Sequence, residues 1–102
     1  MTLQILDEAK EEAAEAFEWY QKRSPKSAER FADLLADAFA SIVAAPTGYP
    51  LYEMRRNPGA IRRARLKGYP YAVVYQILPS SIIIVAVAHT SRRTGYWRPR
   101  VK

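Results

Sequence analysis

The residues best suited to chemistry lie in the second half of this 102-residue chain, and none of them is a carboxylate. Residues 54–102 contain eleven lysines and arginines, no aspartate or glutamate, and the single histidine, His89. An active site made from this half alone has no carboxylate to serve as a base or to bind Mg²⁺. Proton transfer there would depend on tyrosine, histidine, lysine or arginine. The chemistry open to it is metal-independent work on phosphodiesters, or binding without catalysis.

The charges of the chain are divided between its two halves. Residues 1–53 carry all ten carboxylates and five lysines and arginines, a net charge of −5, whereas residues 54–102 carry +11. This asymmetry indicates a polyanionic or acidic partner for the second half. The alternative is that the protein is merely basic overall. A stretch of 49 residues without a carboxylate favours a surface that faces anions.

The composition excludes several kinds of site. The chain has no cysteine and one histidine, so disulfides, thiolate-bound zinc or iron–sulfur centres and multi-histidine metal sites are excluded. We expect no cofactor and no metal. The longest apolar run, Ile82–Ala88, is too short to cross a bilayer, and the acidic N-terminus lacks the basic region of a secretory signal. We therefore expect a cytoplasmic protein with no membrane partner.

The first half of the chain reads as a strand followed by two helices, within a single domain of residues 1–102. A short strand is expected over residues 2–6 and helices over Asp7–Arg23 and from Pro25 to about Ala45, with Asp7 and Ser24 as N-caps. The short loop predicts an antiparallel hairpin. Apolar residues at helical spacing predict its buried stripes: Ala9, Ala13, Ala16, Phe17 and Tyr20, then Ala28, Phe31, Leu35, Ala38 and Ile42.

The second half reads as three strands after an irregular stretch from Pro46 to about Ala60. Strands are expected over residues 61–67, Tyr71–Leu78 and Ile82–Ala88. The last is apolar at every position, which is typical of a strand covered on both faces or central in its sheet. The predicted fold class is α+β, with the hairpin packed on a mostly antiparallel sheet of about four strands.

The strand over residues 61–67 alternates between two kinds of side chain. Ala64 and Leu66 fall on one face, and Arg63, Arg65 and Lys67 fall on the other. Such a cationic face is either a site for anions or a solvated face that discourages pairing at a sheet edge. Both readings remain open from the sequence.

Three segments of the second half resemble the RelE/ParE superfamily of bacterial type II toxins. They are Arg62-Arg-Ala-Arg-Leu66, Gly68-Tyr-Pro-Tyr-Ala-Val-Val-Tyr-Gln76 and Ile83-Ile-Val-Ala-Val-Ala-His-Thr-Ser-Arg-Arg-Thr-Gly-Tyr-Trp97. The resemblance implies a toxin held inactive by a cognate antitoxin, whose C-terminal segment wraps the toxin. Members similar to RelE enter the ribosome and cut mRNA, whereas members similar to ParE poison DNA gyrase and lack the catalytic set.

The resemblance also implies roles for individual residues. Arg63, Arg65, Arg92 and Tyr96 match the catalytic positions of RelE-like nucleases, with Arg93 as the alternative to Arg92. In those enzymes arginines stabilise the phosphate, and here Tyr96 or His89 would handle the proton. The remaining cations, Lys67, Arg93, Arg98, Arg100 and Lys102, would attract nucleic acid. His89 ends a buried strand, which favours a hydrogen-bonded structural role over catalysis. Tyr96 and Trp97 could serve only to fix the tail to the sheet.

Two departures from the RelE pattern bear on catalysis. Ala72 occupies the position where the middle strand of RelE-like nucleases has an arginine. The first basic pair is also arginine, which is always protonated and so a poor general base. The leading hypothesis from the sequence is a toxin that cleaves mRNA on the ribosome. The alternatives are a gyrase-directed toxin without catalysis, favoured by Ala72, and an inactive regulator that only binds its antitoxin or DNA.

Overall fold

The computed structural model describes residues 1–53 and 60–101. Residues 54–59, part of the stretch expected to be irregular, and Lys102 lie outside the described residues. The helices are α1 (Asp7–Arg23) and α2 (Pro25–Ala44), with short 3₁₀ turns at Pro46–Gly48 and Arg98–Arg100. The strands are β1 (Thr2–Ile5), β2 (Leu51–Glu53), β3 (Ile61–Arg65), β4 (Tyr71–Ile77) and β5 (Ser81–His89). In the part of the chain described, no helix has the length and apolar character to span a bilayer.

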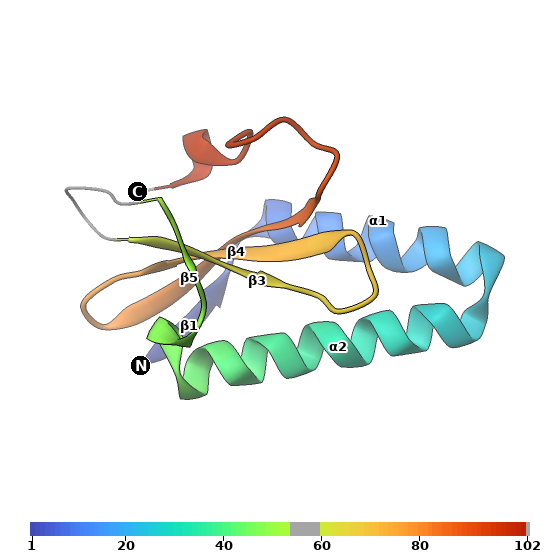
Figure 1. The fold of residues 1–102 in the computed structure, drawn as a ribbon, viewed down its shortest axis with the longest axis horizontal. Helices are drawn as coiled ribbons and strands as arrows, with labels where there is room; N and C mark the ends of the chain where they lie inside the picture. The colour runs from blue at the N-terminus through green and yellow to red at the C-terminus, as the bar shows by residue number, and fades with distance from the viewer. Residues whose placement is uncertain (54–59, 102) are drawn as a thin grey trace.

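The strands form one sheet in the order β1-β5-β4-β3-β2 (Figure 1). β1 runs parallel to β5, and the other neighbours are antiparallel. The α+β prediction is confirmed, with five strands among the described residues instead of about four. The additional strand, β2, pairs Leu51 with Arg62 and spans three residues, too few for an alternating pattern to be recognised in the sequence.

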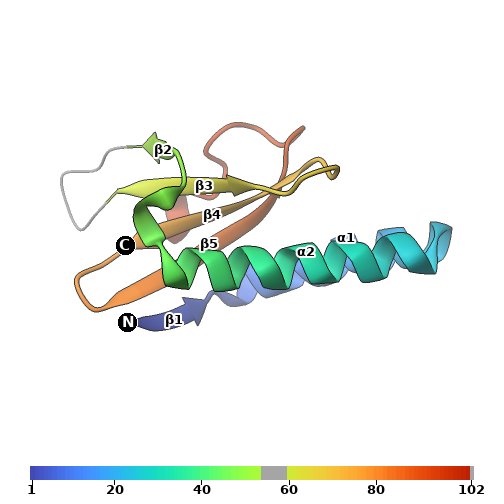
Figure 2. The same ribbon diagram turned by 60° about the horizontal axis from the view of Figure 1, so that its bottom comes forward.

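The helical hairpin forms as expected and covers one face of the sheet (Figure 2). The Ser24 hydroxyl accepts a hydrogen bond from the Ser27 N–H at 3.2 Å, which caps α2, and Pro25 occupies its first turn. All five predicted residues of the α2 stripe are buried. In α1 the prediction was wrong at two residues. Leu6 takes the N-cap position in place of Asp7, and Phe17 is 36% exposed because α1 packs through its alanines.

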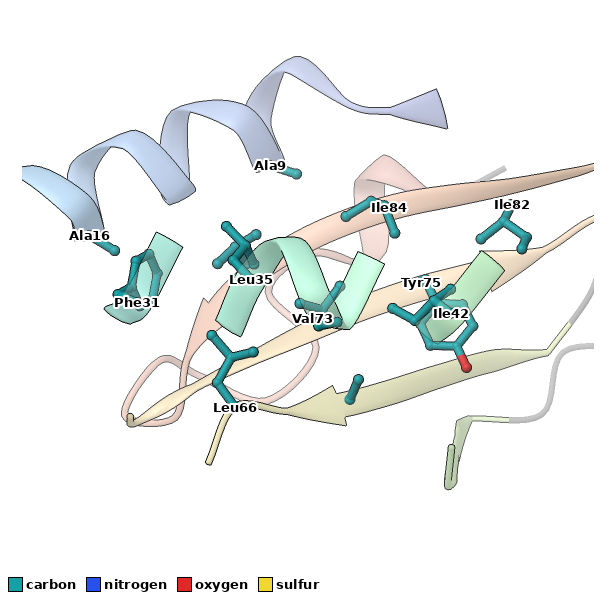
Figure 3. Close-up of a cluster of buried hydrophobic side chains, with 13 residues drawn as sticks. Ala9, Ala16, Phe31, Leu35, Ile42, Leu66, Val73, Tyr75, Ile82 and Ile84 are labelled. Atoms are coloured by element: carbon teal, nitrogen blue, oxygen red, sulfur yellow. The ribbon is translucent and has the colours of Figure 1, made fainter. Parts of the chain in front are cut away.

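The sheet has a core on each face. Between the sheet and the helices, Phe31, Leu35 and Ile42 pack against Val73, Tyr75 and their neighbours (Figure 3). On the opposite face, a smaller cluster gathers around Trp97, which is 2% exposed although it belongs to the C-terminal tail. The molecule therefore has three layers, namely the helices, the sheet and the C-terminal segment of residues 90–101 (Figure 2).

Ile82–Ala88 of β5 is apolar at every position because it contributes to both cores, as predicted. Ile82, Ile84 and Val87 join the helical side, whereas Ile83, Val85 and Ala86 join the Trp97 side. The alternation shifts at Val85 because the register with β4 slips there: Tyr75 pairs with Ile84, and Val74 pairs with Ala86. This bulge changes the face to which side chains in the second half of β5 point, and the direction in which the following segment leaves the sheet.

Candidate functional site

A cavity of about 100 Å³ lies on the face of the sheet opposite the helices, where the C-terminal segment returns over β3, β4 and β5. We call it the cationic cavity. No carboxylate is among its described lining residues, and four of them are arginines. Its lining consists of Tyr52, Arg63, Arg65, Ala72, Val74, Ala88, His89, Thr90, Arg92, Arg93, Thr94, Gly95, Tyr96 and Trp97.

β3 supplies Arg63 and Arg65 to the cationic cavity by simple alternation. Ala64 between them is buried against the helices, so both arginines face the other side of the sheet. Lys67 does not join them. β3 ends at Arg65, and Lys67 lies in the turn that Gly68 makes with a φ of 84°. The predicted strand over residues 61–67 was two residues too long, and its third cation lies off the cationic face.

Aromatic rings support two of the cavity's guanidinium groups. The Cζ atom of Arg63 lies 4.5 Å from the ring centroid of Tyr52, and that of Arg92 lies 3.9 Å from the ring centroid of Tyr96. Such stacking orients a guanidinium while leaving its N–H edge available. Among the described residues, no hydrogen bond or ion pair engages the side chains of Arg63, Arg65, Arg92 or Arg93. The described lining residues thus present four cationic side chains, two of them oriented by aromatic rings, and no anion.

Ala72 forms part of the wall of the cationic cavity from β4. It is 3% exposed and pairs with Arg65 across the β3–β4 ladder. The expected arginine of RelE-like nucleases is therefore replaced by a methyl group beside the cationic side chains.

Glu12 of α1 fixes the C-terminal segment from outside the cationic cavity. Its carboxylate accepts hydrogen bonds from the Tyr96 hydroxyl at 2.5 Å, from both terminal nitrogens of Arg100 at 2.9 and 3.2 Å, and from the backbone N–H of Val87 at 3.1 Å. Arg100 also donates to the Val85 carbonyl at 3.2 Å. These β5 groups lie beyond Ile84, the last β5 residue paired with β1, so the ion pair satisfies backbone where the sheet pairing ends.

The sequence analysis did not identify Glu12. Its carboxylate is one of a run of acidic residues in α1, and only the burial of its side chain, which is 14% exposed, distinguishes it. It lies 84 residues before Tyr96 in the chain. No local pattern joins the two, since their contact depends on how α1 and the tail both pack on β5.

The hydrogen bond to Glu12 determines what Tyr96 can do. Burial, the hydrogen bond to Glu12 and the charge of that carboxylate together raise the pKa of Tyr96 well above its ordinary value of 10.0. The phenol therefore remains protonated at neutral pH, and its proton is directed to Glu12. It is poorly placed to accept a proton from a ribose hydroxyl.

His89 lies at the end of β5, with its ring 5.0 Å from that of Tyr71. Its Nδ1 accepts a hydrogen bond from the backbone N–H of Ser91 at 3.0 Å and contacts the Ser91 hydroxyl at 2.7 Å. An Nδ1 that accepts a backbone hydrogen bond carries no proton, so the proton of the neutral ring is on Nε2. His89 thus presents a donor, not a base, from its other nitrogen.

The structure brings together some of the predicted site residues and separates others. All four predicted catalytic residues and Arg93 line the cationic cavity. Arg98 passes over Gly95, where a Cβ atom would lie 1.7 Å from its guanidinium, and its Cζ is 5.6 Å from the centroid of the Trp97 ring. Arg100 is occupied by Glu12. Among the described residues, no group of three or more histidine, cysteine or acidic side chains could hold a metal ion.

A family model described as the ParE toxin of the type II toxin–antitoxin system, parDE, matches residues 3–94, so the chain belongs to the ParE toxin family. Among solved structures, it is similar to one described as the chromosomal ParDE toxin–antitoxin system from P. aeruginosa. That similarity has a TM-score of 0.70 at 14% identity, over 87% of this chain and 95% of the other. No curated protein matches it significantly.

Proposed function

We propose that this chain is a cytoplasmic toxin that acts on DNA gyrase by binding it, without catalysis of its own, and that a cognate antitoxin inhibits it. Membership of the ParE toxin family supports both the antitoxin and the gyrase target. The single structural observation that carries the choice of binding over catalysis is the hydrogen bond from Tyr96 to Glu12. It occupies the group best suited to proton transfer.

The rest of the cationic cavity agrees with a binding role. Arg63, Arg65, Arg92 and Arg93 are permanent cations, and His89 presents a donor. Such groups can stabilise a charged phosphate but cannot deprotonate a 2′-hydroxyl. Ala72 replaces the remaining arginine of the nuclease pattern. What the cavity offers is recognition of an anion.

Ribosome-dependent mRNA cleavage is the second candidate, and one observation favours it. The four residues that match the RelE-like catalytic positions do converge on the cationic cavity. The arginines among them would stabilise the charge of the phosphate during cleavage. Cleavage also requires a group that transfers a proton. The two candidates differ in whether Tyr96 is a reacting group, and that difference can be tested.

The decisive experiment compares the chain and its Tyr96→Phe variant in cells and with purified gyrase. We expect induction of either to arrest growth, to cause DNA damage with mRNA 5′ ends unchanged, and to inhibit supercoiling in vitro. Co-expression of the adjacent antitoxin gene should relieve the arrest. Codon-phased mRNA cuts that disappear in Tyr96→Phe would instead establish the nuclease. No arrest with either protein would leave only the role of an inactive regulator.

A further inference from the structure

Two further cavities adjoin each other between α1, the start of β4 and the end of β5. Their volumes are about 200 and 190 Å³, and both are lined by Trp19, Tyr71 and His89. We call the two together the aromatic cleft. The larger of them shares Arg92 and Tyr96 with the cationic cavity, so the cleft and that cavity are neighbours. A protein segment that covers the cationic cavity can therefore reach the aromatic cleft as well.

Trp19 is the most exposed ring of the aromatic cleft, with 51% of its surface accessible. The fold already places one guanidinium on this indole. The Cζ atom of Arg23 lies 3.6 Å from the ring centroid, and its Nη1 donates to the Trp19 carbonyl at 2.9 Å. Arg23 is not among the described residues that line the cleft, whereas Trp19 lines both of its cavities. The indole therefore borders the cleft with a surface that Arg23 does not fill.

Glu15 supplies a carboxylate to the same cleft. It precedes Trp19 by one turn of α1, and long side chains on a helix lean towards the preceding turn, so both residues line the larger cavity. Burial and the charge of Glu15 raise the pKa of the Tyr71 phenol above 10.0, which places that charge near the ring. Among the described residues, no hydrogen bond or ion pair engages the Glu15 carboxylate. The other carboxylate of the lining, Glu12, is already paired with Arg100.

Aromatic faces beside an unpaired carboxylate favour a flat cation as the ligand. The face of a tryptophan or tyrosine ring attracts a cation, and a guanidinium can stack on the ring while its N–H groups bind a carboxylate. An anionic ligand would be repelled by Glu15, and a purely apolar one would bury that carboxylate without a partner. Arg92, the arginine in the described lining, is stacked on Tyr96 at 3.9 Å, where the cleft meets the cationic cavity.

We propose that the aromatic cleft binds the guanidinium of an arginine side chain, carried by a protein partner that is acidic overall. The guanidinium would stack on Trp19 and donate hydrogen bonds to Glu15. The acidic surroundings follow from the net charge of +6 and from the neighbouring cationic cavity. Any acidic segment can satisfy that cavity, whereas the arginine would distinguish the correct partner from other acidic segments. The proposal does not depend on gyrase being the target.

The test uses the full-length protein and three labelled peptides, identical except for one central residue between glutamates and serines. That residue is arginine, lysine or citrulline, which has the shape of arginine without its charge. We expect the arginine peptide to bind roughly ten-fold more tightly than the citrulline peptide and about five-fold more tightly than the lysine peptide, measured by fluorescence anisotropy. The cationic protein attracts the citrulline peptide more at long range, because that peptide is the more acidic, so a preference for arginine must arise locally. Equal affinities for arginine and citrulline would overturn the proposal.

Glu15→Gln locates the preference within the molecule. The matched control is Glu18→Gln, which removes the same charge from an exposed position of α1 outside the described lining of the cleft. We expect Glu15→Gln to weaken binding of the arginine peptide about ten-fold and to change binding of the citrulline peptide by less than about two-fold. Glu18→Gln should leave the ratio of the two affinities as it is in the unaltered chain. A ratio that both variants reduce equally, or that neither reduces, would reject the assignment to this cleft.

Trp19→Leu tests the aromatic face separately from the carboxylate. Because Trp19 is half-exposed, the variant should fold, and circular dichroism verifies that it does. We expect the advantage of the arginine peptide over the lysine peptide to disappear, since those two peptides carry the same charge and differ in their capacity to stack. An advantage that persists in Trp19→Leu would show that the arginine does not stack on this ring. These measurements involve neither gyrase nor the antitoxin, so their outcome and that of the supercoiling assay are independent.

Discussion

At the scale of single residues, the chemistry of the site depends on which groups find a partner inside the molecule. Tyr96 and Arg100 both matched positions of interest in the sequence, and both contact Glu12. Arg63, Arg65 and Arg92 have no such partner in the described part of the chain and face the cationic cavity. A carboxylate in the first half of the sequence thus decides which cations of the second half are available.

Tyr96→Phe tests the strength and the pH dependence of the Glu12 contact. A hydrogen bond to a carboxylate contributes about 1.5–3 kcal/mol, so the variant should lose that much free energy of unfolding at pH 7. Because folding raises the pKa of Tyr96, its contribution is complete below pH 10.0, where the unfolded phenol is protonated, and declines as the pH rises further.

The measurement is urea denaturation of both proteins between pH 7 and pH 11. The difference in unfolding free energy between them should be constant up to about pH 9 and smaller at pH 11. A difference that grows above pH 10 would show that folding lowers the pKa of Tyr96, contrary to the contact with Glu12. Loss of codon-phased mRNA cuts together with loss of growth arrest, in a variant that remains folded, would instead identify Tyr96 as a reacting group.

The sequence predicted the arginines of the site better than their environment. Strand alternation placed Arg63 and Arg65 on one face, and the resemblance added Arg92 and Tyr96, all of which line the cationic cavity. Lys67 was misplaced because the strand period was continued into a turn. Glu12 could not be predicted, since its role arises from contacts with residues 75 to 88 positions away.

At the scale of elements, the C-terminal segment is a third layer that depends on two attachments. One is apolar, the insertion of Trp97 among Ile61, Val74 and Ile83. The other is polar, the network of Glu12 with Tyr96, Arg100 and β5. Both lie near the cationic cavity, so the positions of Arg92 and Arg93 depend on them.

Glu12→Gln tests the polar attachment. Loss of the carboxylate charge leaves Arg100, whose side chain is 18% exposed, without its anion. We expect the free energy of unfolding to fall by about 2–3 kcal/mol, and residues 96–101 to lose protection in hydrogen exchange. Glu11→Gln, an exposed neighbour on the same helix, is the control and should change neither quantity appreciably. Similar effects of the two variants would refute the attachment.

Trp97→Ala tests the apolar attachment. Removing a fully buried indole costs roughly 3–5 kcal/mol, a large part of the stability of a domain of this size. Trp19→Ala is the matched control, because Trp19 is 51% exposed on α1, and its loss should cost less than about 1 kcal/mol. Thermal unfolding followed by circular dichroism measures both. Equal melting temperatures for the two variants would mean that the tail does not stabilise the sheet.

The elements themselves followed from local patterns, with exceptions that have physical causes. The bounds of α1 and α2 were predicted within a residue because both helices have regular apolar stripes and Ser24–Pro25 marks the boundary between them. β2 was not predicted because its three residues are too few to show an alternating pattern. The bulge in β5 could not be predicted, because every residue there is apolar and a shift of register does not change the sequence pattern.

At the scale of the whole molecule, the charge division of the sequence becomes a division in space. The carboxylates of the first half lie mainly on the helices, and the described cations of the second half lie on β3, its turn and the C-terminal segment. The helices and the C-terminal segment lie on opposite faces of the sheet (Figure 2). The cationic side of the molecule therefore lies opposite the helices, with the exception of Arg62, which donates to the Thr47 and Tyr49 carbonyls on the helical side.

This polarity predicts how fast an acidic antitoxin segment associates with the toxin. A field of one sign over a face steers an oppositely charged partner and raises its association rate, and salt screens that field over about 8–10 Å. Stopped-flow mixing with the antitoxin should give a rate constant that falls roughly ten-fold or more between 50 and 500 mM salt.

Arg63→Gln/Arg65→Gln should lower the rate at low salt more than Lys26→Gln/Arg30→Gln does, although both remove two charges. Because net charge is equal in those two variants, any difference between them measures where the antitoxin approaches. Identical association rates for the two variants would mean that the antitoxin first contacts the toxin away from the cationic cavity. A rate independent of salt would mean that the charge division does not steer this partner.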